Sequence, residues 1–355
     1  MHSNSNSSVN VAVIGAGMIG LNHIESFQQH PAARVVALAD TSPVRGREAA
    51  DRYRIPTLVT DYRELLNRDD IDIVSVALPN YLHAPVSLAA LRAGKHVMLD
   101  KPMATSVAEA QALADEAKRQ GKVFMVGKNN RFTPEAQTAR RLVEEGLLGE
   151  VYHVKTGWSR RSGIPRPGSW FTQKQFAGGG SCYDIGVHAL DRSLFILGEF
   201  DAVSVSGQTY SKFGPRGLGA GTWGMSESDP NAKFDVDDLA VALIKLRSGR
   251  TVLLESSWAA HQPEADIHGT QLFGTDAGVM LPPLRFYRNS TRGYTTELVE
   301  CSTPYADPNR MVHFVDVVLG KAQPHVKVEE SVAVQRILDA IYRSAETGRE
   351  VRFDT

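Results

Sequence analysis

The chain has 355 residues, which is too long for most single hydrophobic cores, so two domains are predicted. Its net charge of -1 argues against a nucleic-acid partner, because there is no basic excess to release counterions. Two cysteines are too few for a disulfide framework or a zinc site, and they fit a reducing, cytoplasmic environment. No apolar run approaches the roughly 20 residues of a membrane span, and residues 1–8 are predicted to be a disordered polar tail rather than a signal peptide.

Short apolar runs alternate with helical segments over residues 9–127. The runs indicate buried strands, and the helical segments 81–93 and 106–120 end at glycines. The predicted strands are 9–14, 35–39, 73–78, 96–99 and 123–126. This alternation predicts an α/β domain with a doubly wound parallel sheet of the Rossmann type, which binds ligands at the carboxyl ends of its strands.

Longer predicted strands follow within residues 128–355. They are 151–159, 202–210, 239–246, 251–258 and 266–273, and the last segment of the chain is a predicted helix over 329–346. Residues 247–250 join two of these strands as a hairpin. The pattern predicts an α+β domain with a large, mostly antiparallel open sheet and helices on one face. We interpret the Gly-, Ser- and Pro-rich residues 211–233 as a surface loop, with a lid as the alternative.

The first predicted strand runs directly into a GxGxxG sequence that opens a helix, which is the dinucleotide-binding fingerprint in its required context. Gly15 permits the tight turn, Gly17 lets the backbone approach the pyrophosphate, and Gly20 allows helix and strand to pack closely. Met18 and Ile19 lie at the helix N-terminus, which is expected to hold the anion. The sequence therefore predicts a nicotinamide dinucleotide cofactor.

Asp40 indicates which dinucleotide is preferred. It lies 20 residues after Gly20, at the end of the second predicted strand, where a carboxylate accepts the ribose hydroxyls of NAD and repels a 2′-phosphate. The alternative is a simple turn residue before Thr41. We expect NAD, while the nearby Arg45 leaves some use of NADP open.

Three side chains suit proton movement during hydride transfer. Lys101 follows a predicted strand, and Asp184 and His188 follow three glycines at 178–180. Four residues apart, Asp184 and His188 are expected to lie on one face of a helix, and the glycines offer backbone against which a flat ligand can lie. Taken singly, Lys101 reads as a surface charge, Asp184 as a helix cap and His188 as a core histidine.

The chain resembles the Gfo/Idh/MocA family of oxidoreductases over nearly its whole length. The matching elements are residues 15–20, Asp40, 78–83, 93–97, 100–102, 130–132, 146–149, 178–188 and 274–278. The family usually has Glu-Lys-Pro where this chain has Asp100-Lys101-Pro102, so the contact of residue 100 to the nicotinamide ribose is expected to shift. The resemblance also implies a cis peptide bond between Lys101 and Pro102.

The resemblance implies Lys101, Asp184 and His188 as the catalytic set. In that set His188 is the general base, Lys101 stabilises the developing alkoxide, and Asp184 orients the substrate or raises the basicity of the imidazole. No metal is implied. The implied cofactor-binding residues are Gly15, Gly17, Met18, Ile19, Gly20, Asp40, Leu78, Asn80, His83, Asp100, Lys101, Asn129, Arg131 and Trp170.

The predicted substrate-binding residues are Lys101, Arg160, Trp170, Tyr183, Asp184 and His188, with Trp258, His261 and His268 as further candidates. Trp170 is expected to cover the nicotinamide or stack on a sugar face. The arginines at 160, 161 and 166 either hold an anionic substrate or belong to a solvated loop.

Together these observations predict an NAD-dependent dehydrogenase. It would oxidise a ring secondary hydroxyl of a cyclic polyol, a pyranose or a glycoside to a ketone. The alternatives are an NAD-recycling glycoside hydrolase and a non-catalytic NAD-binding sensor. We expect a homodimer or homotetramer formed through the C-terminal sheet, and neither nucleic acid nor membrane as a partner.

Overall fold

The computed structural model describes residues 8–223, 227–229, 231–303 and 309–353. It divides into two compact units, Met1–Gly127 with Asn309–Val332, and Lys128–Pro308 with Ala333–Thr355. The predicted tail falls almost wholly outside the described residues, as does part of the predicted loop at 211–233. The sequence assigned residues 309–332 to the second domain, whereas they cluster with the first unit. The reason is that Phe314 and its neighbours are buried in a helix that packs on the first helix of the chain.

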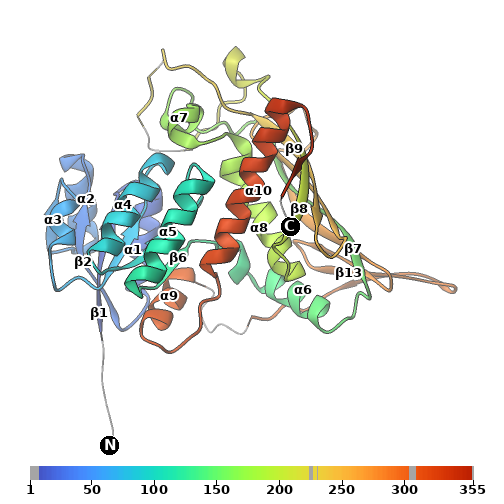
Figure 1. Ribbon diagram of the computed structural model, residues 1–355, viewed down its shortest axis with the longest axis horizontal. Coiled ribbons are helices and arrows are strands. Elements are labelled where there is room, and N and C mark those ends of the chain that lie inside the picture. The colour runs from blue at the N-terminus through green and yellow to red at the C-terminus, as the bar shows by residue number, and fades with distance from the viewer. Residues whose placement is uncertain (1–7, 224–226, 230, 304–308, 354–355) are drawn as a thin grey trace, which may run out of the picture. The chain divides into compact units, whose positions relative to one another are not determined.

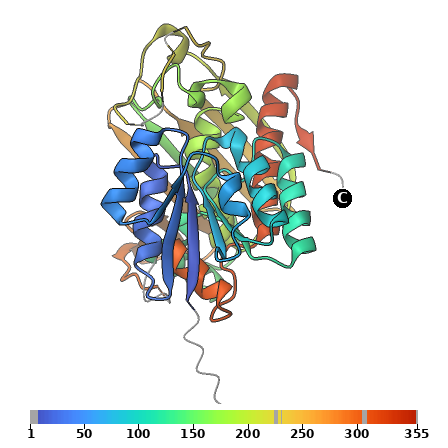
Figure 2. The ribbon, with the colours of Figure 1, turned by 90° about the vertical axis from the view of Figure 1, so that its left-hand side faces the viewer.

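The first unit is built on a six-stranded parallel sheet with the strand order β3-β2-β1-β4-β5-β6. Its strands are β1 (Val9–Ile14), β2 (Ala33–Ala39), β3 (Thr57–Val59), β4 (Ile73–Val76), β5 (His96–Leu99) and β6 (Phe124–Val126). Its helices are α1 (Met18–Gln28), α2 (Pro43–Tyr53), α3 (Arg63–Leu66), α4 (Asn80–Arg92), α5 (Val107–Gln120) and α9 (Arg310–Val318). Figure 2 shows helices on both sides of this sheet, which explains why its central strands are apolar at nearly every position. The predicted Rossmann fold is confirmed.

The second unit contains a nine-stranded sheet with the order β14-β13-β12-β11-β7-β10-β9-β8-β15. Its strands are β7 (Val151–Arg160), β8 (Ala202–Tyr210), β9 (Leu239–Leu246), β10 (Thr251–Ser257), β11 (Asp266–Gly274), β12 (Gly278–Leu281), β13 (Arg285–Ser290), β14 (Gly293–Leu298) and β15 (Val351–Arg352). Only β7 and β10 pair in parallel, and the other neighbours are antiparallel. The predicted large, mostly antiparallel open sheet is confirmed.

Helices cover one face of this sheet, as Figure 1 shows for α6, α8 and α10. The helical segments of the unit are η1 (Asn129–Phe132), α6 (Pro134–Glu144), η2 (Trp170–Thr172), α7 (Lys174–Ala177), the π-helix η3 (Cys182–Gly186), α8 (Val187–Leu197) and η4 (Gly214–Arg216). Helix α10 (Val328–Thr347) starts in the last residues assigned to the first unit and continues in the second. Its buried residues join those of α8 and of the central strands in one apolar core.

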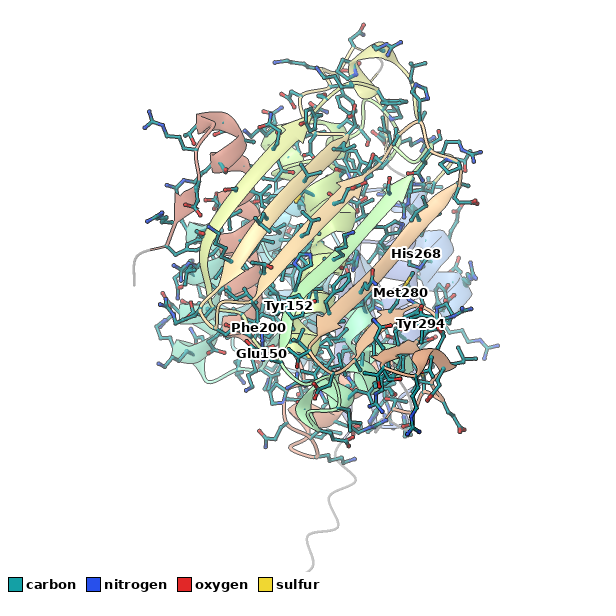
Figure 3. All side chains as sticks on the ribbon, turned by 90° about the vertical axis from the view of Figure 1, so that its right-hand side faces the viewer. Glu150, Tyr152, Phe200, His268, Met280 and Tyr294 are labelled. Carbon is teal, nitrogen blue, oxygen red and sulfur yellow. The ribbon has the colours of Figure 1, made fainter. Side chains whose placement is uncertain are left out.

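Among the residues that the structure describes, no helix lies on the other face of the sheet (Figure 3). Along β9 and β10, buried residues alternate with exposed ones, and Leu243 and Leu253 are register partners on the open face. Met280 on β12 also belongs to the large apolar side chains that stay exposed. This face is where we expected self-association.

Candidate active site

The glycine-rich loop lies between β1 and α1 and is tightly packed at two of its three glycines. Gly15 has a φ of +102°, and a Cβ there would lie 2.2 Å from the carbonyl oxygen of Ala77. A Cβ on Gly20 would lie 1.8 Å from the carbonyl oxygen of Gly15. By contrast, a Cβ on Gly17 would meet nothing within 4 Å. The loop thus has the close packing and the open approach that a pyrophosphate needs, with Met18 and Ile19 exposed beside it.

Asp40, just after β2, is a buried carboxylate with four donors from its own chain. It accepts hydrogen bonds from the backbone nitrogens of Ala16 at 2.7 Å and Ser42 at 2.8 Å. The guanidinium of Arg45 completes the set, with Nε at 3.2 Å and Nη2 at 2.8 Å. A carboxylate has about four lone-pair positions, so the chain's own donors match its capacity. Asp40 therefore ties the glycine-rich loop to α2, and Arg45 donates to both of the carboxylate oxygens that were expected to accept the ribose hydroxyls.

Asp100 follows β5 and points into the protein. Its Oδ1 lies 3.7 Å from Nε2 of His23, a fully buried residue of α1 whose Nδ1 is 2.8 Å from the hydroxyl of Ser75. Burial alone would raise the pKa of Asp100, but His23, Lys101 and Arg310 hold it well below its usual range. The shorter side chain at this position is thus stabilised as an anion by the interior of the first unit.

His83 of α4, one of the predicted cofactor-binding residues, bridges two loops. Its Nδ1 is 2.7 Å from the carbonyl oxygen of Pro102, and its Nε2 is 2.8 Å from that of Leu78. Burial lowers the pKa of His83, an effect that the two carbonyls oppose. Each ring nitrogen lies within hydrogen-bond distance of a backbone carbonyl, so His83 connects the segments that follow β4 and β5. The Lys101–Pro102 peptide, which follows β5, is cis, as predicted.

Within the first unit, the structure brings most of the predicted cofactor residues to the carboxyl ends of neighbouring strands. Gly15 follows β1, Asp40 follows β2, and Leu78 follows β4 closely. Lys101 and Asp100 follow β5, and Asn80 is the first residue of α4. This is the edge at which parallel α/β sheets bind ligands.

The second unit carries Asp184 and His188 at the start of a long helical segment. Asp184 lies in the π-helix η3, and His188 is the second residue of α8, which follows it directly. π-helical turns recur at functional sites. Oδ2 of Asp184 accepts a hydrogen bond of 2.9 Å from Nε1 of the fully buried Trp258. The imidazole of His188 lies beside the indole of Trp158, with ring centroids 6.0 Å apart and the ring planes tilted by 53°.

The glycines before Asp184 pack against protein rather than offering a free surface for a flat ligand. A Cβ on Gly179 would lie 2.3 Å from the hydroxyl oxygen of Tyr342, and one on Gly180 would lie 1.9 Å from the carbonyl oxygen of Asp237. The expected ligand contact along this backbone is therefore wrong for Gly179 and Gly180. Their lack of side chains instead lets α10 and the start of β9 approach the helix.

Arg131, one of the predicted cofactor-binding residues, is a buried cation in the second unit. Its Nε and Nη2 donate to the two carboxylate oxygens of Asp191 at 2.8 and 2.7 Å, and its guanidinium lies over the rings of Phe195 and Phe200. Nζ of Lys128 lies 3.8 Å from Oδ1 of the same carboxylate. Burial alone would raise the pKa of Asp191, but these two cations and His188 keep it lowered. No motif in the sequence indicated Asp191, which lies one turn after His188.

An aromatic and charged cluster surrounds Trp158 next to His188. Arg160 lies over the indole of Trp158, and its Nε is 3.4 Å from Oδ2 of Asp266. Asp266 also accepts from Nε1 of Trp158 at 3.1 Å and pairs with His268 at 3.0 Å. Burial alone would raise the pKa of Asp266, but these hydrogen bonds and the charge of Arg160 hold it below its usual value. The cluster thus places an aromatic ring, a guanidinium and a carboxylate beside His188.

Three other predicted residues have different surroundings. Trp170 stacks on Phe171 with ring centroids 3.7 Å apart, and Phe171 in turn contacts Trp223. Tyr183, a predicted substrate-binding residue, is buried, and its hydroxyl accepts from Gln335. Asn129 is exposed in η1.

Comparison with known proteins identifies the class to which this fold and these residues belong. Residues 9–128 match the family model described as "Oxidoreductase family, NAD-binding Rossmann fold", and residues 136–279 match the "GFO/IDH/MocA C-terminal domain". The chain belongs to the Gfo/Idh/MocA family of oxidoreductases, and its first unit is the NAD-binding domain of that family.

The relatives include sugar dehydrogenases. The chain is 33% identical to D-glucoside 3-dehydrogenase of Escherichia coli (strain K12), with 98% of each chain covered. It is 32% identical to levoglucosan dehydrogenase of Pseudarthrobacter phenanthrenivorans, over 74% of this chain and 72% of that protein. A solved structure of levoglucosan dehydrogenase in complex with NADH and levoglucosan superposes with a TM-score of 0.84 at 25% identity, covering 98% of this chain and 99% of that one.

The described part of the chain shows neither a metal site nor a membrane-spanning helix. There, no group of three or more His, Cys, Asp or Glu side chains is arranged to hold a metal ion. None of the helices in the same ranges has the length and apolar character that crossing a bilayer requires.

Proposed function

We propose that the protein is an NAD-dependent dehydrogenase that oxidises a ring secondary hydroxyl of an uncharged pyranose or pyranoside to a ketone. The observation that carries this proposal is the indole of Trp158 beside the imidazole of His188. An aromatic ring of this kind stacks on the apolar face of a sugar. The names of the two relatives support a glycoside or anhydrosugar over an inositol.

In the proposed reaction His188 accepts the hydroxyl proton as general base, since an imidazole has a pKa near the working pH. The ammonium of Lys101 donates a hydrogen bond that stabilises the developing alkoxide. Asp184, held by Trp258, orients the substrate hydroxyls. Bound NAD supplies the acceptor for the hydride that leaves carbon. The open approach at Gly17 and the tight turn at Gly15 fit the pyrophosphate of that cofactor.

The substrate is proposed to be uncharged because the nearby arginines already have protein partners. Arg160 pairs with Asp266, and Arg161 donates to the carbonyl oxygens of Gln262 and Pro263. An anionic substrate would have to compete for guanidiniums that the chain already uses. This argument favours a neutral sugar over a uronate or a nucleotide sugar.

The open sheet face of the second unit is proposed to join copies of the chain into a homodimer or homotetramer. Leu243, Leu253 and Met280 expose apolar surface on it, and Tyr152 and Tyr294 add exposed aromatic rings at its strands (Figure 3). A sheet face of this kind forms an isologous contact between two identical chains. Cys182 and Cys301 are free thiols, which fits the cytoplasm as the proposed compartment.

The experiment that tests the proposed function follows NADH absorbance with alkyl glucosides, anhydrosugars, free pyranoses, uronates and inositols, and measures aglycone release in parallel. Net NADH from neutral pyranosides without release supports the dehydrogenase. Aglycone release without net NADH would replace it with the NAD-recycling hydrolase. Turnover of uronates alone would contradict the neutral substrate. Tight NAD binding with no turnover of any compound would favour the sensor.

A further inference from the structure

Asp237, just before β9, gathers donors from the start of the helical segment that carries Asp184 and His188. Its Oδ1 accepts from the backbone nitrogen of Gly180 at 2.7 Å. Its Oδ2 accepts from the hydroxyl of Ser181 at 2.7 Å and from the backbone nitrogen of Cys182 at 3.1 Å. The side chain is almost wholly buried, and these three donors are uncharged.

Two further contacts of Asp237 hold the start of this helical segment in place. Its carbonyl oxygen accepts from the backbone nitrogen of Ser181 at 3.0 Å, and the hydroxyl of Tyr342 on α10 donates to Oδ1. No side chain fits between Asp237 and Gly180, where a Cβ would lie 1.9 Å from that carbonyl. The start of the helical segment is therefore held from the side by both the backbone and the carboxylate of one residue.

A carboxylate at this place has a clear physical role. The first backbone N–H groups of a helix have no partner within the helix, and a negative charge there also complements the helix dipole. Asp237 supplies the hydrogen-bond acceptors and the negative charge from outside the helix. No residue of the helix itself therefore has to act as its cap. Asp184 is left to project its carboxylate to Trp258.

We propose that Asp237 is a positioning residue, which holds the start of the segment 180–188 so that Asp184 and His188 keep their orientation during turnover. The proposal rests on the catalytic roles given to those two residues above. It predicts that a change at Asp237 alters the rate of the chemical step more than the binding of NAD, because the glycine-rich loop belongs to the other unit.

The replacement Asp237→Asn tests this with almost no change of shape. The hydroxyls of Ser181 and Tyr342 can turn and accept a hydrogen bond, but the backbone nitrogens of Gly180 and Cys182 only donate. They bond to different carboxylate oxygens, so either orientation of the amide sets its NH2 against a main-chain N–H. Asp238→Asn is the matched control, because Oδ2 of this neighbouring buried aspartate accepts three backbone N–H groups of the separate loop at 212–214.

The measurements are kcat, the KM for NAD, the thermal midpoint and the hydrogen exchange of the amides at 180–188 and 212–216. We expect Asp237→Asn to lower kcat about 100-fold, the scale of a small misplacement of reacting groups, with the KM for NAD within twofold of the unmodified protein. Exchange should speed up at 180–188 only. Asp238→Asn removes the same charge, but its amide oxygen can take the place of Oδ2 toward the N–H groups at 212–214. It should therefore lose less thermal stability than Asp237→Asn, change exchange only at 212–216, and keep kcat within threefold.

Equal losses of kcat in both variants, or a kcat near normal in Asp237→Asn, would overturn the positioning role. If Asp237→Asn does not fold, Tyr342→Phe removes one donor and leaves the carboxylate, and a loss of kcat below twofold would then overturn it. An unmodified protein that is inactive on every sugar would contradict the proposed function alone. Unchanged exchange at 180–188 would, even in that case, contradict the anchoring by Asp237.

Discussion

The salt bridge between Asp40 and Arg45 is expected to set the balance between NAD and NADP. Asp40 has its acceptor positions filled by Ala16, Ser42 and Arg45. Only Arg45 can swing away, because its side chain is 32% exposed whereas the other donors are backbone groups. The ribose of NAD must therefore displace Arg45 to reach the carboxylate. A 2′-phosphate, in contrast, would meet the guanidinium as a favourable partner.

The replacement Arg45→Ala should change the affinities for NAD and NADP in opposite directions. Displacing a partly exposed ion pair costs up to about 1 kcal/mol, so removing the competitor should tighten NAD binding by up to about fivefold. A charge-assisted contact to phosphate contributes about 1.5–3 kcal/mol, so NADP binding should weaken by about 10- to 100-fold. The preference for NAD over NADP should then rise by a factor of ten or more. Asp40→Ser should move the preference in the opposite direction.

The assay is a fluorescence titration of each variant with NADH and NADPH at fixed ionic strength. Arg47→Ala is the control, since Arg47 lies on the same helix and makes only an exposed contact of 3.7 Å to Asp51. It removes the same charge without touching Asp40. If Arg45→Ala and Arg47→Ala change both dissociation constants alike, the ion pair does not govern the ribose end and the reasoning fails.

Three further outcomes are expected. Lys101→Ala and His188→Ala should each lower kcat about 10²- to 10⁴-fold and leave the dissociation constant of NAD unchanged; near-normal turnover would remove the role of that residue. Leu253→Glu on the open sheet face should reduce the mass in light scattering to that of a monomer, whereas Leu218→Glu, in a loop, should not; an unmodified protein that is already monomeric at micromolar concentration would contradict the interface. Burial lowers the pKa of His23 below its ordinary 6.5, so the unfolded chain takes up a proton first as the pH falls. The free energy of unfolding should therefore decrease as the pH falls below about 6.5, and a smaller decrease in His23→Gln, measured by denaturant titration, is the check.

The sequence was sufficient where a pattern is local. The strands at 9–14, 202–210 and 239–246 have the predicted bounds, because apolar residues repeat with the period of a buried or half-buried strand. The strands β12, β13 and β14 were missed. Residues 293–298 are exposed at every position, so they show no apolar alternation to detect.

The candidate site shows the same division. The fingerprint at residues 15–20 predicts its own geometry, since each glycine answers a local packing demand. The surroundings of His83 and Arg131 could not be predicted because they depend on the fold: His83 contacts the carbonyls of Leu78 and Pro102, and Arg131 binds Asp191, 60 residues away. Asp237 gave no signal for a similar reason, since only the fold brings it to the backbone of Gly180.

The single parallel pair in the second sheet has a consequence for engineering. Strand β7 ends at Arg160, and β10, which pairs with it in parallel, begins at Thr251. Residues 161–250 therefore form a crossover connection from one end of the strand pair to the other. The helix with Asp184 and His188 makes part of this return, and its start lies near the end of β7, where Trp158 meets His188. The hairpin at 247–250 lies at the opposite end of the pair, next to His153. A fluorescent label or a short peptide inserted in this hairpin should therefore be carried without disturbing the chemistry.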